Sequence, residues 1–438
     1  QRKGGFCRGD DMKVAFCTLG CKVNQYESQS MEQALIKRGF ECVGASEEAD
    51  VYIVNSCTVT AESDRKTRQN VRHLRKLHPD AVIVLTGCMP QAFPEDARLL
   101  TQADIVTGNR SNKQIPDMID EFFRTRERIV RIAQHENGEK FSGELINDFR
   151  ERTRATVKIE DGCNRFCSYC VIPYARGRVR SKPLEDIREE ISSLEKKGFS
   201  EIVLVGINLS AYGTDCGASI CDAVELAASF DGIKRVRLGS LEPDHMTPDV
   251  TKRLAECKKL CPQFHISLQS GCDKTLKRMN RHYTAAEYEE LCTRLRSEFE
   301  DATLTTDVMV GFSGETKEDF EISRDFVRKI GFEKVHVFPY SRRAGTRAAE
   351  FPDVVENAEK ERRSREMIAA AGEVRHEFLE RQIGRTVEVL FEEKLRDGSI
   401  QGYTANYTPV RIKSGCTHGL RKVKITACGD DWCEGELI

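Results

Sequence analysis

Three cysteines lie within one short segment of the chain. Cys163, Cys167 and Cys170 stand in the run CNRFCSYC. Thiolates hold iron–sulfur clusters and structural zinc ions. Three thiolates on a four-iron cluster leave one iron without a protein ligand, so that iron is open to another molecule. A structural zinc would need a fourth cysteine or histidine, which the loop does not contain. The spacing therefore favours an iron–sulfur cluster with an open iron.

Three further cysteines, Cys21, Cys57 and Cys88, follow the apolar runs VAFCTLG, VYIVNS and AVIVLTG. Helix-length amphipathic stretches alternate with these runs, at 27–38, 62–78 and 94–100. This alternation predicts a parallel α/β sheet, in which loops at the carboxyl edge converge. The three cysteines could thus meet at one place. Buried structural cysteine is the alternative, and it is our interpretation of Cys17 and Cys42.

Length and composition indicate the cellular compartment, and the compartment affects how the cysteines are interpreted. The chain has 438 residues, 18 cysteines and a net charge of −2. Its apolar runs are shorter than the roughly 20 residues that span a bilayer, so we predict no membrane partner and a cytoplasmic location. We treat residues 1–11 as a leader or a remnant preceding Met12. In a reducing compartment, cysteines serve metals or catalysis more often than disulfides.

The middle of the chain predicts a second α/β region. Six candidate strands follow one another, ATVKIE, EIVLVG, IKRVRLGS, PQFHISLQ, ATLTTDVMVG and EKVHVFP, with helical segments such as 184–197 and 285–298 between them. Six units are too few for a closed eight-fold barrel, so we predict an open partial (β/α)6 barrel with its site at the strand carboxyl ends.

The last part of the chain changes pattern. A charge-rich helical stretch at 355–381 is followed by short β-rich runs separated by Gly, Asn and Pro, which predict a small all-β barrel. The expected domains are 12–136, 149–378 and 379–438. The fold class is therefore an α/β multidomain protein.

The Cys163 segment, placed after the first strand of a partial barrel, resembles the radical S-adenosylmethionine (SAM) superfamily. The resemblance implies that the open iron binds SAM and cleaves it to methionine and a 5′-deoxyadenosyl radical, while the protein supplies positioning. The expected SAM contacts are polar or small residues at the strand ends: Gly206, Asn208, Ser240, Glu242, Gln269 and Arg281. Loop capping is the alternative role of Asn208, Ser240 and Glu242. The run Val205-Gly206-Ile207-Asn208 departs from the Gly-Gly-Glu run common in that superfamily, which puts the contact to the SAM amine in doubt.

The strings LGCKVNQYES, NSCTVT and TGCMPQ, together with VKIEDGCNRFCSYCVIPYARGRVRS, resemble the methylthiotransferase family. The resemblance covers the chain from Met12. It implies a second [4Fe-4S] cluster on Cys21, Cys57 and Cys88 and two SAM molecules per turnover, one for radical generation and one for sulfur methylation. Ser313 stands where the family usually has proline, which alters loop rigidity.

Three substrates occur in this family: threonylcarbamoyladenosine of tRNA, isopentenyladenosine of tRNA, and an aspartate of a ribosomal protein. GCKVNQYES and NSCTVT look most like the first branch. We therefore predict 2-methylthiolation of N6-threonylcarbamoyladenosine at position 37 of tRNA. This position lies in the anticodon loop, where an adenine can leave the base stack and enter an active site. The other two substrates are alternatives, as is a non-enzymatic RNA-binding iron–sulfur protein. An electron donor and a sulfur source are further partners, and the sequence identifies neither.

Three basic runs predict RNA contacts. Arg65, Arg68, Arg72 and Arg75 recur every three or four residues and so share a helix face. The segment 174–182 adds cations without an acid, and 398–429 combines cations with Tyr403 and Tyr407 in a region that resembles the TRAM domain. Each run alone is more often a solvated face. The predicted RNA-binding residues are Arg65, Arg68, Arg72, Arg176, Arg178, Arg411, Lys413, Arg421, Lys422 and Lys424.

Overall fold

The computed structural model describes residues 12–143, 146, 154–415 and 419–438. The chain forms two compact units. Unit 1 contains residues 1–149, 160–186 and 341–346, and unit 2 contains 150–159, 187–340 and 347–438. The expected leader at 1–11 and the expected domain start at 149 lie outside the described residues, and the three domain boundaries stay a prediction. Within the described part of the chain, no helix is long and apolar enough to cross a membrane.

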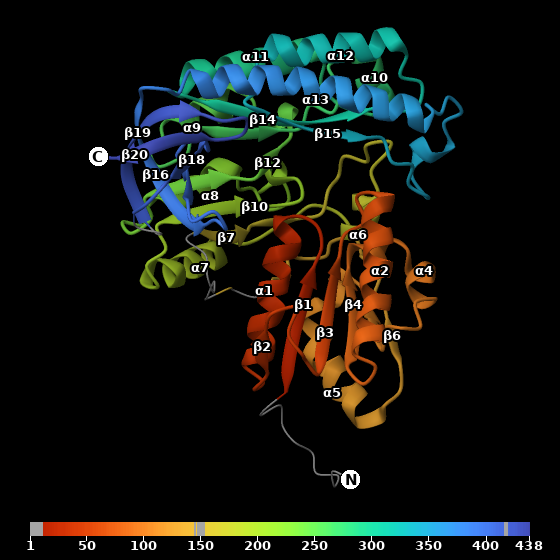
Figure 1. The fold of residues 1–438 in the computed structure, drawn as a ribbon. Helices are drawn as coiled ribbons and strands as arrows, with labels where there is room; N and C mark the ends of the chain where they lie inside the picture. Colours follow the sequence, from red (N-terminus) through yellow and green to blue (C-terminus); the bar gives the residue numbers. More distant parts are fainter. Residues whose placement is uncertain (1–11, 144–145, 147–153, 416–418) are drawn as a thin grey trace. The chain divides into compact units, whose positions relative to one another are not determined.

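Unit 1 is built on a six-stranded sheet in which every neighbouring pair is parallel, as predicted (Figure 1). The sheet order is β2-β1-β3-β4-β5-β6. The strands are β1 (Lys13–Thr18), β2 (Glu41–Val43), β3 (Val51–Ser56), β4 (Val82–Gly87), β5 (Ile105–Thr107) and β6 (Ile129–Arg131). All residues of β3 and β4 are buried, because helices cover both faces of the sheet.

Two layers of helices complete this part of unit 1. Apolar residues of α1 and α5 pack on one face of the sheet, and those of α2 and α4 pack on the other. The helices are α1 (Lys22–Ile36), α2 (Ala61–Leu77), α3 (Cys88–Ala92), α4 (Pro94–Arg98), the 3-10 helix Asn109–Gln114 and α5 (Ile115–Thr125). The first helix begins five residues earlier than the pattern predicted, directly after Cys21.

The segment 160–186 belongs to unit 1 as well. It contains a short antiparallel pair, β8 (Glu160–Asp161) with β9 (Arg180–Ser181), and the helix α6 (Ile172–Arg176). Helix α6 packs against α3. The loop with Cys163, Cys167 and Cys170 lies between β8 and α6, so it is anchored at both ends.

Unit 2 contains the six predicted strands of the partial barrel, all paired in parallel. They are β7 (Arg154–Lys158), β10 (Glu201–Val205), β11 (Arg235–Leu238) with its short continuation β12 (Ser240–Leu241), β13 (Gln263–Ile266), β14 (Thr303–Val310) and β15 (Lys334–Pro339). The strands form two sheets, β11-β10-β7 and β12-β13-β14-β15. The open parallel arrangement confirms the fold class.

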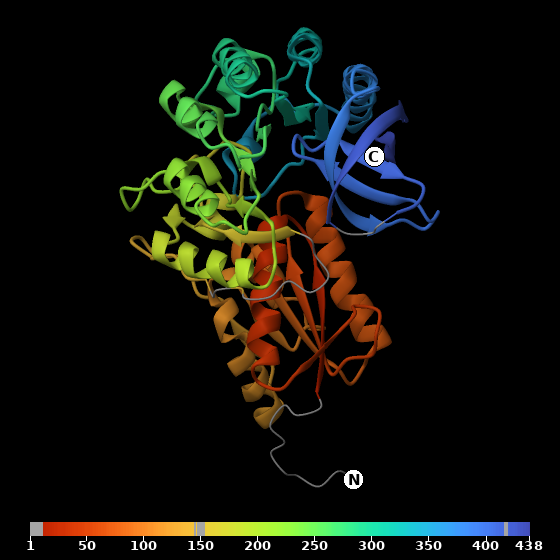
Figure 2. The same cartoon turned by 90° about the vertical axis from the view of Figure 1, so that its left-hand side faces the viewer.

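Helices alternate with these strands (Figure 2). Capping boxes begin three of them, with Ser219, Thr284 and Thr316 as N-cap residues. The buried Ser313, which replaces the family's proline, accepts a hydrogen bond from Arg278 through its carbonyl oxygen. The helices are α7 (Leu184–Lys196), α8 (Ile220–Ala228), α9 (Pro248–Ala255), α10 (Asp273–Arg278), α11 (Ala285–Glu298), α12 (Lys317–Ile330) and α13 (Asn357–Glu380).

The end of the chain forms the predicted small barrel, closed in the order β16-β17-β18-β20-β19. Its strands are β16 (Thr386–Lys394), β17 (Ile400–Thr404), β18 (Pro409–Ile412), β19 (Gly419–Cys428) and β20 (Cys433–Leu437). Alternate residues of each strand fill its core, and Phe378 and Leu379 at the end of α13 pack against that core.

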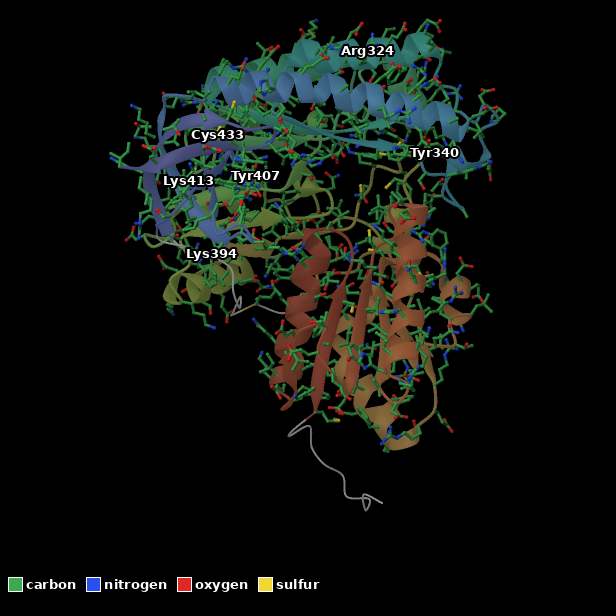
Figure 3. All side chains as sticks on the ribbon, in the orientation of Figure 1. Arg324, Tyr340, Lys394, Tyr407, Lys413 and Cys433 are labelled. Carbon is green, nitrogen blue, oxygen red and sulfur yellow. The ribbon has the colours of Figure 1, made fainter. Side chains whose placement is uncertain are left out.

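The turn between β17 and β18 packs against the first residues of the partial-barrel strands. Arg237 donates to the carbonyl oxygens of Thr404 and Ala405. Its guanidinium also lies 4.7 Å from the ring centre of Tyr407, a residue labelled in Figure 3. Tyr403 stacks on Tyr407 with ring centres 4.5 Å apart. Both tyrosines therefore attach the small barrel within unit 2, which corrects their interpretation as aromatic RNA contacts.

Glu201 neutralises the arginines at this junction. It is 1% exposed, and its carboxylate lies 3.1 Å from Arg237 and 3.8 Å from both Arg154 and Arg235. Arg154 also pairs with Glu392 and Arg235 with Glu388, so Arg237 is the arginine that depends most on Glu201. Its charge needs this carboxylate, because an unpaired buried charge is costly.

Replacing Glu201 with Ala is predicted to destabilise unit 2 by about 3–5 kcal/mol, since it leaves the buried Arg237 without a carboxylate partner among the described residues. Urea unfolding followed by circular dichroism measures the effect. The matched control is Glu289→Ala, which breaks an exposed ion pair with Lys329 and should cost no more than about 1 kcal/mol. Equal losses for the two variants would contradict the assignment.

Candidate functional site

The three N-terminal cysteines lie at the carboxyl ends of three adjacent strands, β1, β3 and β4 (Figure 1). Cys21 is the N-cap residue of α1, Cys57 follows β3, and Cys88 begins α3. Burial raises the pKa of the Cys57 thiol, and the neighbouring Cys21 adds to the effect. The parallel pairing of these strands thus places the three cysteines at the same edge of the sheet.

Two glycines permit this convergence. Gly87 has φ +98°, and a Cβ there would lie 2.4 and 2.5 Å from backbone atoms of Ser56. Gly20 has φ +113°, and a Cβ there would lie 2.9 Å from the Cβ of Cys57. A side chain at either position would push the strand ends apart, so the glycine before Cys21 and the glycine before Cys88 are structural requirements of the site.

A buried amide network holds Cys21 and the end of β3. The Cys21 thiol donates to Asn24 Oδ1 at 3.3 Å, and Asn24 Nδ2 donates to Asn55 Oδ1 and to the carbonyl oxygen of Ser56. Asn55 in turn donates to Ser28 Oγ. Asn24 and Asn55 were not among the residues predicted for this site. The signal was present, because Asn55 interrupts an otherwise apolar buried strand.

Cys88 has two side-chain donors at its sulfur. Arg176 Nε lies 3.3 Å from Cys88 Sγ, and Asn109 Nδ2 lies 3.8 Å away. Burial raises the pKa of the Cys88 thiol to about 12, against the opposing effect of Arg176. The thiol therefore keeps its proton at neutral pH unless a metal displaces it.

Arg176 does not face solvent. Its side chain is completely buried and binds both carboxylate oxygens of Glu27, at 2.5 and 3.0 Å, with Asp161 3.4 Å away. The prediction that Arg176 contacts RNA is therefore wrong. A count of cations along the segment 174–182 could not reveal that this one points inward.

The second cysteine group lies in the loop between β8 and α6. Cys167 is buried, whereas Cys163 and Cys170 are half-buried. The Cys163 amide donates to the carbonyl oxygen of Gly177, and the Cys170 amide to that of Cys167. Phe166 has φ +49°, an uncommon conformation for a bulky residue. None of the described cysteines forms a disulfide.

No three His, Cys, Asp or Glu side chains in the described part of the chain are close enough to hold one metal ion. A four-iron cluster makes a different demand, because each cysteine binds its own iron and the sulfurs stay farther apart. The two all-cysteine groups fit that demand in donor type and in number.

The expected SAM contacts lie at the carboxyl ends of the strands in unit 2. Glu242 and Arg281 form an ion pair, and Arg281 also donates to Tyr283 and to the carbonyl oxygen of Ser267. Gln269 has φ +66°, and its buried side-chain oxygen has no hydrogen-bond partner among the described residues. A buried acceptor left open at a strand end fits a ligand that carries an amine or hydroxyl donor.

The other expected SAM contacts lie close by along the chain. Asn208 is buried in the loop after β10, next to the half-buried Gly206, while Ser240 is exposed at the start of β12. Ser210, not singled out from the sequence, accepts from the Glu242 amide at 2.6 Å. The SAM roles of all these residues stay a prediction.

Three of the four arginines predicted on one face of α2 lie around a shared surface hollow, and their RNA role stays a prediction. Arg65, Arg68 and Arg72 line a surface hollow of about 420 Å³ together with Gln69, His73 and Lys76. Arg75 is different: it pairs with Asp104 at 2.5 Å and donates to the carbonyl oxygens of Pro79, Ala81 and Gln102. It joins α2 to the following loops and is not part of the open face.

The predicted RNA-binding cations of the small barrel lie on its surface. Lys413, Arg421, Lys422 and Lys424 are exposed, with Lys413 labelled in Figure 3. Lys422 stands opposite Glu388 and Lys424 opposite Glu436 in the strand register. Arg411 instead lies 3.6 Å from the centre of the Trp432 ring and donates to Gln401. The surface is thus less uniformly positive than the sequence run indicated.

Comparison with known proteins identifies the family. Residues 13–108 match the model "Uncharacterized protein family UPF0004", and residues 157–327 match "Radical SAM superfamily". The chain is 35% identical to a Bacillus subtilis protein named threonylcarbamoyladenosine tRNA methylthiotransferase MtaB, over 97% of this chain and 96% of that protein. The chain belongs to the radical SAM methylthiotransferase family. This membership confirms the resemblance seen in the sequence.

A second methylthiotransferase is equally similar. The chain is 36% identical to tRNA-2-methylthio-N(6)-dimethylallyladenosine synthase of Pelotomaculum thermopropionicum, over 88% of each chain. Among solved structures, the radical SAM methyltransferase TsrM of Kitasatospora setae matches with a TM-score of 0.54 at 14% identity, over 75% of each chain, which supports the fold alone. As a radical SAM enzyme, this methylthiotransferase uses a [4Fe-4S] cluster and SAM.

Replacing Gly87 with Ala tests whether the strand ends need their close approach. Both Gly87 and Gly198 have positive φ, but a Cβ at Gly198 meets nothing within 4 Å. Gly198→Ala should cost about 1 kcal/mol through its φ alone. Gly87→Ala should cost clearly more, because Ser56 cannot move aside without parting β3 and β4. Denaturant unfolding of both variants decides; similar losses would show that the contact does not matter.

Proposed function

We propose that this methylthiotransferase acts on tRNA and converts N6-threonylcarbamoyladenosine at position 37 to its 2-methylthio derivative. In this proposal Cys163, Cys167 and Cys170 hold the SAM-binding cluster, and Cys21, Cys57 and Cys88 hold a second one. When bound, these groups supply radical cleavage of SAM and transfer of a methylthio group. A cytoplasmic location, an electron donor and a sulfur source belong to the same proposal.

The observation that carries the proposal is the presence of both cysteine groups in unit 1. Helix α6 follows the Cys163–Cys170 loop directly and packs against α3, which begins with Cys88. Arg176, the last residue of α6, reaches the Cys88 sulfur. Transfer of sulfur to a carbon radical needs the sulfur and the radical source at a fixed spacing, and the packing of α6 on α3 supports such an arrangement.

The chain's residues would supply binding and orientation. Asn24, Asn55 and Asn109 fix the loops of the N-terminal cysteines through hydrogen bonds. In unit 2, the paired Glu242 and Arg281 and the open acceptor of Gln269 present polar groups at the strand ends. We assign these groups to SAM, because its amine and ribose hydroxyls need acceptors.

A polar cluster supports threonylcarbamoyladenosine over isopentenyladenosine. His265 Nδ1 lies 3.0 Å from Thr305 Oγ1 and its Nε2 lies 3.3 Å from Asp307, with the His336 ring 5.9 Å away. These side chains alternate along their strands with residues that pack on helices, so they line the opposite face of the partial barrel. A threonylcarbamoyl group carries polar atoms, a hydroxyl among them, that the imidazole and hydroxyl groups of this cluster can hydrogen-bond, whereas an isopentenyl group is apolar.

The exposed cations support an RNA substrate. Arg178 lies 4.5 Å from the centre of the Phe166 ring, next to Cys167, and Tyr174 is an exposed aromatic residue, with 53% of its surface accessible. Phe166 and Tyr174 meet edge to face at 5.8 Å. A cation and an exposed ring side by side fit a phosphate and an unstacked base. The open face of α2 and the surface cations of the small barrel would add phosphate contacts.

Mass spectrometry of tRNA nucleosides after anaerobic turnover with SAM tests the substrate. The expected product is 2-methylthio-N6-threonylcarbamoyladenosine, formed from tRNA that carries the threonylcarbamoyl group. Methylthio transfer only to isopentenyladenosine, or only to a ribosomal-protein aspartate, would overturn the substrate assignment. An absence of 5′-deoxyadenosine as well would favour a non-enzymatic RNA-binding iron–sulfur protein.

Replacing Cys21, Cys57 and Cys88 together with Ala separates the two cysteine groups. The variant should still form 5′-deoxyadenosine from SAM, because Cys163, Cys167 and Cys170 are intact, and it should lose methylthio transfer. Its iron content should fall by about half if each group holds one four-iron cluster. The control is Cys17→Ala and Cys42→Ala, which should change neither product. Methylthiolation by the triple variant would disprove the assigned roles.

A further inference from the structure

Arg176 is a buried cation to which the proposed function assigns no chemical role. It lies six residues after Cys170, and its side chain is 0% exposed. The guanidinium contacts three separate parts of unit 1: Cys88 at the start of α3, Glu27 in α1, and Asp161 in β8. Each of these parts carries or adjoins one of the cysteine loops.

We infer that Arg176 is a positioning residue that tunes the cluster on Cys21, Cys57 and Cys88 through its hydrogen bond to the Cys88 sulfur. The inference rests on the proposed function, because it requires a cluster on those three cysteines. It gives the basic segment 174–182 an internal role besides the RNA contact proposed for Arg178.

The direction of the effect follows from the geometry. An N–H donor directed at a ligating sulfur withdraws electron density from it and stabilises the more electron-rich, reduced cluster, which raises the reduction potential. The Nε–Sγ distance of 3.3 Å is within reach for such a bond. Burial strengthens the effect, since water does not screen the charge. Glu27 and Asp161 offset part of the positive charge but leave the Nε donor on the sulfur.

The contacts of Arg176 also fix its orientation. Both Nη atoms donate to the two oxygens of Glu27. This bidentate pair fixes the plane of the guanidinium, and with it the direction of the Nε–H bond. Glu27 lies in the helix that begins directly after Cys21. A lysine would keep the charge but could not hold the carboxylate and the sulfur together.

The competing explanation is a purely structural ion pair that joins α6 to α1. Such a pair would affect stability without changing the electronic state of the cluster. Arg180 provides the matched comparison. It is also buried in the same segment and lies 3.6 Å from Asp161, but its hydrogen bonds go to the carbonyl oxygens of Arg176 and Arg178.

The test uses the full chain with Cys163, Cys167 and Cys170 replaced by Ala, reconstituted anaerobically with iron and sulfide, so that the N-terminal cysteines alone bind the cluster. A redox titration followed by electron paramagnetic resonance gives its midpoint potential and spectrum. We expect Arg176→Gln to lower the potential and change the spectrum, Arg176→Lys to give an intermediate potential, and Arg180→Gln to match the parent.

Unchanged potentials in both Arg176 variants would overturn the inference, and so would an equal shift in Arg180→Gln. If Arg176→Gln binds no iron, Arg176→Lys decides: a lowered potential supports the inference and an unchanged one overturns it. A parent without iron on its N-terminal cysteines would instead overturn the second cluster of the proposed function, and the inference with it. If only the inference fails, the parent still binds iron on its N-terminal cysteines.

Discussion

The close approach of β3 and β4 at their carboxyl ends is the constraint on which the N-terminal site depends. Cys21, Cys57 and Cys88 are more than thirty residues apart from one another in sequence, so only the sheet can bring them together. Parallel pairing places their loops on one edge, and Gly87 lets the backbone of β4 reach that of Ser56 without a side chain between them. The chemistry of this site is therefore a property of the sheet register.

Buried arginines provide the second level of order. Arg176 joins α1, α3 and β8, Arg237 joins the partial barrel to the small barrel, and Arg343 pairs with Asp64 beside the loop of Cys57. Each side chain is at most 5% exposed. Buried ion pairs add little net stability compared with apolar packing, but losing one partner is costly. They therefore specify which segments meet more than they raise the stability of the fold.

Much of the fold could be predicted from the sequence because its signals are local. Strand and helix periodicity gave the parallel sheet, the six-stranded open barrel and the small closed barrel, and the Cys163 spacing with its family motifs gave the family. The short strands β2, β5 and β6, three residues each, carry too little pattern to be found. Asn24, Asn55 and Asn109 escaped notice because an amide reveals its role only through its partners.

The errors in the basic segments share one physical cause. Charge along a sequence reports composition, whereas burial depends on what the fold places opposite each side chain. Arg176 and Arg180 turn inward to carboxylates of unit 1, while Arg178 between them stays exposed over Phe166. Arg75 likewise leaves the α2 face because Asp104 lies within reach. One short run thus combines two cations that point inward to carboxylates with one that stays exposed, so neighbouring residues of the same stretch of backbone have opposite environments.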